Sequence, residues 1–194
     1  MYRKFIKPSF DRILAVILMV VLAPFLVLVV LIIFIIDGSP VFFIQNRSGI
    51  GMKCFRMYKF RTLAPLENSD LSMKNRQFTK TGRSLRKTGI DELPQLLNIL
   101  KGEMSFVGPR PMPVEYVVKY NDRQRERFEV MPGITGWAQV AGRNQISWSE
   151  RFKLDIWYVG NQSFLLDVKI CLMTMVQIVK LQPEHTMPVF NGSN

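Results

Sequence analysis

The sequence predicts a single compact domain of the α+β class, predominantly helical, that carries an N-terminal membrane segment. The first observation is a run of 24 residues without a charge at positions 13–36, which is long enough to enter a bilayer. The second is that short aromatic-rich runs, which suggest a small β-hairpin, precede longer segments with helical periodicity. A chain of 194 residues has room for one domain with its own core. We therefore expect one domain over residues 1–194, with the membrane segment at about 8–36, a globular part at about 37–181 and a C-terminal tail at 182–194.

The charges around the uncharged run limit how it can lie in a membrane. Basic residues flank it on both sides: Arg3, Lys4, Lys7 and Arg12 before it, and Arg47, Lys53, Arg56, Lys59 and Arg61 after it. Because basic flanks stay on the cytoplasmic side, both ends favour the same side of the membrane. A cleaved signal peptide is disfavoured, since the run is too long and residues 37–40 offer no Ala-x-Ala-like cleavage site.

Pro24 lies in the middle of this run. A proline inside a helix removes one backbone donor, and its ring clashes with the carbonyl of Val20, so we expect a kink or a break there. Each arm would then be only about 17 Å long, which reaches the middle of a bilayer. Two topologies remain open on these grounds. One is a re-entrant helix-break-helix that enters and leaves through the cytoplasmic leaflet, and the other is a kinked helix that spans the membrane.

The globular part begins with a predicted β-hairpin. Its strands are expected at residues 41–44 and 54–60, on either side of the glycine-containing turn at 46–51. Residues 64–80 are polar and irregular and are expected to form a surface loop. The glycines of the segment 131–144 would either let its backbone approach a ligand closely or simply connect two helices.

Three segments further along the chain show helical patterns. Residues 114–130 are expected to be helical, and Ser147 and Glu150 have the spacing of a capping box that opens a helix closing near Gly160. Residues 163–180 are too polar to span a membrane. They would form either an interfacial amphipathic helix, with basic residues at the lipid headgroups, or a core helix.

Composition narrows the chemistry that the chain can perform. The 26 Lys and Arg against 15 Asp and Glu give a net charge of +11, so we expect anionic partners such as phospholipid headgroups, phosphorylated small molecules or nucleic acid. Only two cysteines, Cys54 and Cys171, and one histidine, His185, are present. These numbers argue against a disulfide framework, a cysteine-based zinc site and any Ser-His or Cys-His catalytic arrangement. Proton transfer and metal binding therefore fall mainly to carboxylates.

The most informative feature is the acid pair Asp91-Glu92. It stands at the head of residues 93–100, whose leucines recur at i, i+3, i+4 and i+7, and Gly102 would end that helix. In the simplest interpretation Asp91 is a helix cap and Glu92 faces the positive end of the helix dipole. In a second interpretation both acids are ligands of Mg²⁺, which takes one or two carboxylates and completes its shell with water and phosphate oxygens. An aspartate can also attack phosphorus itself.

Basic residues that match phosphate oxygens surround this pair in the sequence. The candidates for phosphate binding are Lys59, Arg61, Arg86, Arg110 and Arg143. Arginine presents a planar fork to phosphate, and the prolines on both sides of Arg110 fix its backbone. Together with a metal ion, such residues would position a phosphoryl group and neutralise its charge, which is the task of a protein in phosphoryl transfer. The glycine signatures of dinucleotide and P-loop nucleotide sites are missing.

Several motifs resemble those of the bacterial sugar transferases, that is, the monotopic phosphoglycosyl transferases, and they occur in the order of that family. They are Tyr58-Lys-Phe-Arg-Thr62, Asp91-Glu-Leu-Pro-Gln95, Leu100-Lys-Gly-Glu-Met-Ser-Phe-Val-Gly-Pro-Arg-Pro111, Pro132-Gly-Ile-Thr-Gly136 and Gly142-Arg-Asn144. The resemblance runs from about residue 3 to about residue 181. It is to the minimal form of the family, without additional membrane helices.

The resemblance implies an enzyme that transfers a phosphosugar from a UDP-sugar to polyprenyl (undecaprenyl) phosphate, releases UMP and uses Mg²⁺, as the first membrane step of glycan assembly. By position in the motifs, Asp91 would be the nucleophile of a ping-pong mechanism with a covalent aspartyl-phosphosugar intermediate. Glu92 would be its partner in metal binding or acid/base work. The resemblance also implies a re-entrant membrane helix broken at Pro24, in the bacterial inner membrane, with a catalytic part at about 37–181 on the cytoplasmic face.

A protein of another class remains as the alternative, namely a basic membrane-anchored binding or scaffold protein without catalysis. It would account for the net charge and the membrane segment, but it gives no reason for an acid pair beside arginines. With the resemblance, the expected partners are a UDP-sugar, polyprenyl phosphate and the lipid bilayer, and no nucleic acid. The sequence leaves the sugar and the oligomeric state open.

Overall fold

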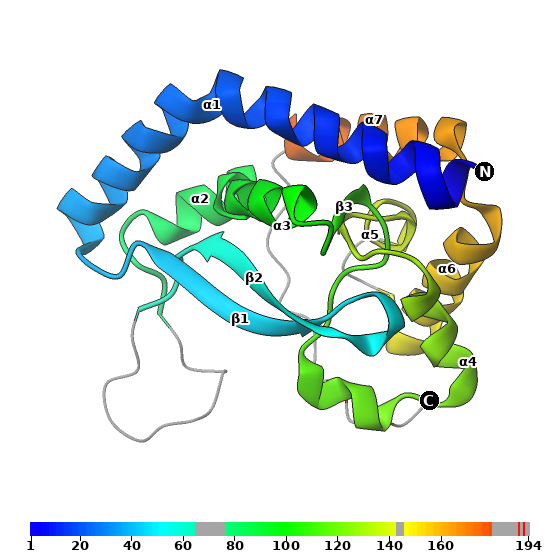
Figure 1. Ribbon diagram of the computed structural model, residues 1–194. Coiled ribbons are helices and arrows are strands. Elements are labelled where there is room, and N and C mark those ends of the chain that lie inside the picture. Colours follow the sequence, from blue (N-terminus) through cyan, green and yellow to red (C-terminus); the bar gives the residue numbers. More distant parts are fainter. Residues whose placement is uncertain (65–76, 143–145, 180–189, 191, 193–194) are drawn as a thin grey trace.

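The structure is a computed structural model (Figure 1), and it describes residues 1–64, 77–142, 146–179, 190 and 192. Within this part of the chain the fold is predominantly helical, as predicted, and it has two small sheets, of which one, the β-hairpin, was predicted. Most of the predicted surface loop and of the predicted C-terminal tail lies outside the described residues.

The N-terminal segment forms one long helix. After a π-helical turn, Tyr2–Ile6 (η1), helix α1 covers Lys7–Asp37 and passes through Pro24. Figure 1 shows that α1 bends near its middle, so the structure has one bent helix in the region where a kink or a break was expected. Among the described residues, this N-terminal helical segment is the one that is long and apolar enough to cross a membrane, and only 11% of its most apolar window is buried.

The predicted β-hairpin is confirmed. Strands β1 (Phe42–Ser48) and β2 (Cys54–Phe60) are antiparallel, with Phe42 opposite Phe60. Gly51, in the connecting turn, has a φ of +59°, which a residue with a side chain rarely adopts. The hairpin therefore closes where the glycine-containing turn was expected.

The segment with the acid pair is less regular than predicted. It consists of helix α2 (Gly82–Thr88), a 3-10 segment η4 (Ile90–Gln95) and helix α3 (Leu96–Leu100). The single helix expected from the leucine spacing therefore starts as a 3-10 turn, in which Pro94 has no N–H to donate to the preceding turn. Gly102 has a φ of +73° and follows the end of α3, as predicted.

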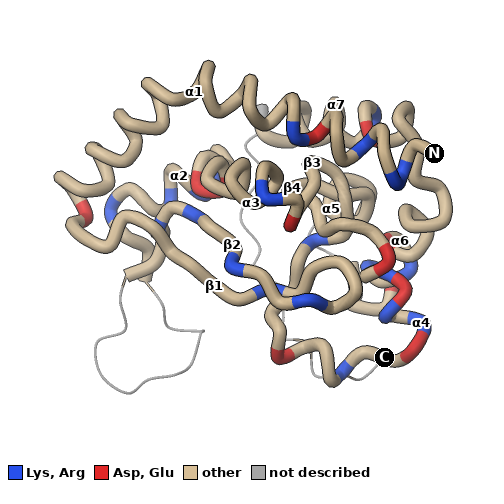
Figure 2. The backbone as a smooth tube through the Cα atoms, in the orientation of Figure 1, with Lys and Arg blue, Asp and Glu red and all other residues tan. Residues whose placement is uncertain are grey.

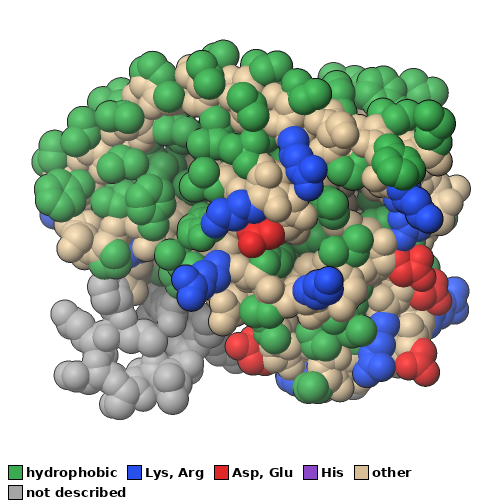
Figure 3. All heavy atoms as spheres, in the orientation of Figure 1, with side chains coloured by type: hydrophobic (Ala, Val, Ile, Leu, Met, Phe, Trp, Pro, Cys, Tyr) green, Lys and Arg blue, Asp and Glu red, His purple; other side chains and the backbone are tan. Residues whose placement is uncertain are grey.

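Side chains on one side of α1 pack on the globular part at two places. Ala15, in the first half, is buried in a cluster with Leu96 and Ile99 of α3, and Ile33, in the second half, is buried in a cluster with Phe60 of β2. The opposite side of α1 is apolar and exposed. Figure 3 shows hydrophobic side chains along the rim that α1 forms, and Figure 2 shows no charged residue in its middle. An apolar surface of this extent indicates contact with another apolar phase.

Two short strands form the second sheet. Strand β3 (Ser105–Val107) pairs in parallel with β4 (Gly133–Thr135). The chain between them is not the continuous helix that was predicted for residues 114–130. It is divided into η5 (Val114–Lys119), α4 (Asp122–Arg125) and η6 (Glu126–Glu129). The division occurs because the side chain of Asn121 accepts the backbone N–H of Gln124 and so starts a new helix.

Three helices complete the described chain: α5 (Trp137–Gly142), α6 (Trp148–Asn161) and α7 (Phe164–Val179). The capping box of Ser147 and Glu150 at the start of α6 is confirmed. Helix α7 packs on the core, as one of the two expectations had it. Its core-facing side is fully buried at Ile170, whereas it exposes Leu165, Leu172, Met175 and Val176. In Figure 1, α7 lies beside the N-terminal half of α1.

Both ends of α1 are tied to the globular part. Near its N-terminus, Lys7 Nζ lies 2.6 Å from Asp167 Oδ2 of α7, in a buried ion pair. At its C-terminus, the guanidinium of Arg61 donates hydrogen bonds to the carbonyl oxygens of Asp37 and Gly38. The two ends of the long helix are therefore held by the same body.

Candidate active site

The acid pair lies in η4, between α2 and α3 and in contact with strand β2 (Figure 2). Gly89 ends α2 with a φ of +73°, and η4 begins directly after it. Asp91 is not a helix cap, since Gly89 occupies the cap position and no side chain caps η4. The cap interpretation of Asp91 is therefore wrong. The residue is instead buried, with 4% of its surface exposed.

Glu92 forms two ion pairs with residues far from it in the sequence. Its Oε1 lies 2.5 Å from Lys59 Nζ on β2 and 3.0 Å from Arg110 Nη2. Burial alone would raise the pKa of Glu92, but Lys59 and Arg110 outweigh burial and lower the pKa to about 2. Glu92 is thus a permanent anion that balances two cations.

Asp91 has the opposite electrostatic character. Burial, the largest cause, raises the pKa of Asp91 to about 6; the neighbouring charge of Glu92 adds to this, whereas Lys59 and Arg86 oppose it. The hydrogen bonds and ion pairs among the described residues include none to the Asp91 carboxylate. The ionised form of Asp91 is therefore less stabilised than that of Glu92, and no described side chain occupies the lone pairs of the Asp91 carboxylate. Both properties suit a nucleophile.

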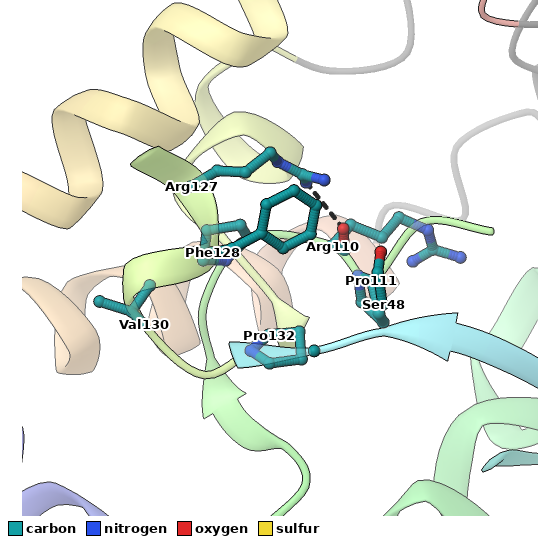
Figure 4. Close-up of a pocket in the computed structure, with 9 residues that line it drawn as sticks. Ser48, Arg110, Pro111, Arg127, Phe128, Val130 and Pro132 are labelled. Atoms are coloured by element: carbon teal, nitrogen blue, oxygen red, sulfur yellow. Dashed lines mark hydrogen bonds between the residues drawn. The ribbon is translucent and has the colours of Figure 1, made fainter. Parts of the chain in front are cut away.

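Arg110 is positioned through its backbone as well as through its guanidinium. Nη2 of Arg127 donates a hydrogen bond to the carbonyl oxygen of Arg110 at 2.8 Å. Arg127 is itself held by Asp155, with Nη2 and Oδ2 2.8 Å apart in a fully buried pair. Figure 4 shows the Arg110 carbonyl facing Arg127 while the Arg110 guanidinium points away from it. With a proline on either side, the direction in which Arg110 leaves the backbone is therefore fixed.

Glycines allow the segment of Arg110 to pack against a second segment, backbone on backbone. A Cβ on Gly108 would lie 2.2 Å from the carbonyl oxygen of Met131, and one on Gly133 would lie 2.1 Å from the nitrogen of Gly108. The N–H of Gly133 also donates to the carbonyl oxygen of Pro109 at 3.0 Å. These glycines are therefore needed for packing that places Arg110, a use that was not foreseen for them.

A small pocket opens beside Glu92. It is lined by Arg47, Met57, Lys59, Glu92, Gln95, Arg110, Pro111 and Gly133, and its empty space is about 200 Å³. This space includes open solvent, so the pocket does not enclose a whole organic ligand. The pocket suits a small anionic group, such as the phosphates of a larger ligand whose remainder lies outside.

Comparison with known proteins identifies the family. The model of the bacterial sugar transferase family matches residues 2–181. The chain belongs to the bacterial sugar transferases. The prediction of an enzyme is thereby confirmed, and the alternative of a scaffold protein without catalysis loses its support.

Relatives of different lengths share this region. EpsL of Bacillus subtilis, an uncharacterized sugar transferase, is 47% identical over 90% of this chain and 87% of its own length. The UDP-glucose:undecaprenyl-phosphate glucose-1-phosphate transferase of Escherichia coli is 34% identical over 89% of this chain and 40% of its own length. The undecaprenyl-phosphate galactose phosphotransferase of Salmonella typhimurium is 32% identical over 91% of this chain and 41% of its own length. This sugar transferase thus spans most of EpsL and less than half of the two longer proteins.

The structure brings together two of the predicted phosphate-binding residues of this sugar transferase, since Lys59 and Arg110 meet at Glu92. It does not bring Arg61 into the pocket. The Arg61 guanidinium is committed to main-chain carbonyl oxygens at the end of α1, including that of Ser39. In this position Arg61 fastens the membrane helix to β2.

The remaining predicted residues lie elsewhere. Arg86 is exposed in the last turn of α2, with its guanidinium 5.5 Å from the centre of the Phe78 ring, and its charge acts on Asp91. Arg143 lies outside the described residues. Arg47 also lines the pocket, but it was not among the predicted site residues. Nothing in the sequence distinguishes it from the other basic residues around the hairpin.

The donors present fit a magnesium ion better than a metal that needs several protein ligands. The described residues contain no group of three or more His, Cys, Asp and Glu side chains that could hold a metal. Mg²⁺ needs only one or two carboxylates, because water and substrate phosphates complete its shell. Of the acid pair, Asp91 fits this role more readily, because Oε1 of Glu92 is already bound by Lys59 and Arg110.

Proposed function

We propose that this sugar transferase moves a sugar-1-phosphate from a UDP-sugar to undecaprenyl phosphate, with release of UMP, through a covalent intermediate on Asp91. The observation that carries the proposal is the division of the acid pair. Asp91 is buried with a raised pKa and no described partner, while Glu92 is neutralised by Lys59 and Arg110. The names of the relatives in Escherichia coli and Salmonella typhimurium support the acceptor and the transferred group. Those names contain different sugars, glucose and galactose, so we propose a sugar-1-phosphate as the transferred group without assigning the sugar.

The reaction consists of two displacements at the same phosphorus. In the first, an oxygen of ionised Asp91 attacks the phosphorus that carries the sugar, the bond to the bridging oxygen breaks, and UMP leaves with the electron pair. In the second, an oxygen of undecaprenyl phosphate attacks that phosphorus, and the Asp91 carboxylate leaves. The product is undecaprenyl diphosphate sugar, and the enzyme regains its free carboxylate. This sequence gives ping-pong kinetics.

The residues around Asp91 supply charge stabilisation. Lys59 and Arg110 face the pocket and can bind the phosphate oxygens on which negative charge is held during transfer. Glu92 keeps these two cations in place when no substrate is bound. Mg²⁺, held by Asp91 with help from Glu92, would neutralise the diphosphate of the donor when bound.

For the membrane segment we propose the re-entrant topology in the bacterial inner membrane, with the catalytic part on the cytoplasmic face. Three observations support it: basic residues flank both ends of the uncharged run, α1 contains Pro24 and bends near its middle (Figure 1), and both ends of α1 are tied to the same globular part. A helix that spans the bilayer would separate its ends by its own length. A cysteine placed at position 3 should be labelled only from the cytoplasmic side of sealed vesicles; labelling from the opposite side would contradict the proposal.

Release of UMP tests the proposed reaction. Purified protein, undecaprenyl phosphate and Mg²⁺ are incubated with each member of a panel of UDP-sugars, and UMP is quantified. We expect release with at least one donor, and a loss of more than about 1,000-fold in Asp91→Asn, because its amide cannot act as the nucleophile. Release of no UMP from any donor, or full activity of Asp91→Asn, would contradict the proposal. Lys53→Gln, which changes an exposed residue of the hairpin turn, serves as the control.

A further inference from the structure

Arg47 is a third cation in the pocket of Lys59 and Arg110. It lies near the end of β1, next to the turn of the hairpin, and its side chain lines the pocket beside Glu92 and Gln95. It belongs to neither of the two ion pairs of Glu92. The pocket thus contains three basic side chains beside one acid that is already paired with two of them.

The hydrogen bonds of Arg47 leave much of its guanidinium unused. Nη1 donates to the carbonyl oxygen of Pro111 at 3.1 Å, and Nη2 donates to the side-chain oxygen of Gln45 at 2.7 Å. Both acceptors are neutral. Nε is buried and has no acceptor within the described part of the chain. A guanidinium has five N–H groups, so Arg47 retains donors for a further acceptor.

The surroundings of Arg47 make an anion the favoured acceptor. Burial and the neighbouring charge of Arg110 lower the pKa of Arg47 to about 10, and the charges of Glu115 and Glu92 only partly oppose this. The group is therefore still a cation at neutral pH, but one held in an unfavourable setting. No carboxylate of the described residues forms an ion pair with it. A bound phosphate would offset both the cost of burying the Arg47 charge and the repulsion between Arg47 and Arg110.

The position of Arg47 indicates which substrate, the UDP-sugar or undecaprenyl phosphate, has its phosphate bound by this residue. Helix α3 lies between α1 and β2, since α1 packs on α3 and α3 packs on β2. Arg47 enters the pocket from the other strand of that hairpin, at the turn end, where the hairpin contacts η5 and η6. In the proposed topology α1 lies in the membrane, so the lipid acceptor would come from the side of α1, whereas a nucleotide would come from solvent.

We propose that Arg47 binds the nucleotide phosphate of the donor and stabilises the leaving UMP in the first displacement. This proposal rests on the proposed function. It makes Arg47 a residue of the first half-reaction alone, because undecaprenyl phosphate enters after UMP has left.

The two half-reactions can be measured separately with Arg47→Gln. In the first, enzyme, UDP-sugar and Mg²⁺ are mixed without lipid, and UMP and the mass adduct are followed over time. In the second, enzyme that already carries the adduct is freed of donor and mixed with undecaprenyl phosphate. We expect the first half-reaction to slow by about 10- to 100-fold, the loss typical of a hydrogen bond to a charged group. The second half-reaction should stay within about twofold of the wild type.

Two further variants separate a direct role from a general one. Lys53→Gln removes one positive charge from the same hairpin at an exposed position outside the pocket, and we expect no change in either half-reaction. Arg47→Lys keeps the charge but not the fork, and we expect it to slow the first half-reaction less than Arg47→Gln does. If thermal unfolding shows that Arg47→Gln is not folded, Arg47→Lys replaces it in the measurement of the two half-reactions.

The outcomes distinguish the possible failures. A slow second half-reaction with a normal first one would overturn the inference and assign Arg47 to the lipid phosphate. Wild-type rates in both half-reactions would overturn any role in binding substrate. If the wild type itself released no UMP from any donor, the proposed function would fail, and not only the role of Arg47.

Discussion

Asp91 and Glu92 are adjacent in η4, yet their carboxyl groups differ in pKa by several units: burial raises the pKa of Asp91 to about 6, and Lys59 and Arg110 hold that of Glu92 at about 2. The difference arises because the cations contact Glu92 directly and act on Asp91 only through space. Two neighbouring acids thereby obtain separate tasks. One is a permanent structural anion, and the other is the group that titrates near neutral pH.

The titration of Asp91 predicts the pH dependence of adduct formation. Only the ionised carboxyl attacks, so the rate should rise with pH and level off above the pKa of about 6. Between pH 5 and pH 7 the ionised fraction, and with it the rate, should increase about tenfold. Single-turnover release of UMP without lipid acceptor measures this. A rate that is flat across the range would show that Asp91 is fully ionised at pH 5 or is not the nucleophile.

Asp91→Asn should be more stable than the wild type at neutral pH. A carboxyl whose pKa is raised on folding destabilises the folded state above that pKa, and the effect disappears where both states are protonated. The shift from 3.8 to about 6 corresponds to at most about 3 kcal/mol, or a rise of several degrees in Tm. Thermal unfolding at pH 7.5 and at pH 4 tests this: the gain should be present at the first pH and mostly lost at the second, because at pH 4 the Asp91 carboxyl is protonated in the folded state and about half ionised in the unfolded state. A variant less stable than the wild type at pH 7.5 would contradict the burial argument.

Glu92→Gln should destabilise the protein, because it leaves Lys59 and Arg110 as neighbouring cations without their anion. Breaking a fully buried pair costs about 3–5 kcal/mol. Since the Arg110 side chain is 32% exposed, we expect about 2 kcal/mol and a Tm lower by about 4–8 °C. The double variant Lys59→Met/Glu92→Gln should recover part of the loss. An unchanged Tm in Glu92→Gln would mean that the ion pairs contribute nothing to stability.

Arg127→Lys should reduce activity through Arg110. Lysine keeps a positive charge for Asp155 but cannot also reach the Arg110 carbonyl with a second fixed N–H. We expect kcat/KM for the UDP-sugar to fall about tenfold, with a smaller effect in a variant that already lacks the Arg110 side chain. If Arg127→Lys lowered kcat/KM equally with and without the Arg110 side chain, Arg127 would not act through Arg110.

Arg61→Gln should lower the Tm and leave the KM for the UDP-sugar within about twofold of the wild type. Its hydrogen bonds go to carbonyl oxygens at the end of α1 and not to the pocket. The expected loss is about 2 kcal/mol, as for hydrogen bonds from a charged group. A KM raised tenfold with an unchanged Tm would instead return Arg61 to the pocket, where the sequence had placed it.

The elements that depend on a local sequence pattern could be predicted from the sequence. The hairpin, the capping box at Ser147 and the stop at Gly102 follow from turn chemistry and spacing within a few residues. The acid pair with Lys59 and Arg110 could be chosen because motif order supplied the long-range information. The capping box of Asn121 and Gln124 is a local pattern of the same kind, and it divides the segment that was predicted to be one helix. The prediction for Arg61 failed for a different reason. Arg61 is as basic as Lys59, and only the tertiary fold decides which of the two faces the pocket.

The central claim is that Asp91 carries the phosphosugar. Intact-mass spectrometry of the protein after incubation with a UDP-sugar and Mg²⁺, in the absence of undecaprenyl phosphate, tests it most directly. The wild type should gain the mass of one sugar-1-phosphate less water, located by peptide mapping to Asp91, and undecaprenyl phosphate should remove it. Asp91→Asn should gain nothing. An adduct on Asp91→Asn, or one mapped to another residue of the wild type, would contradict the assignment.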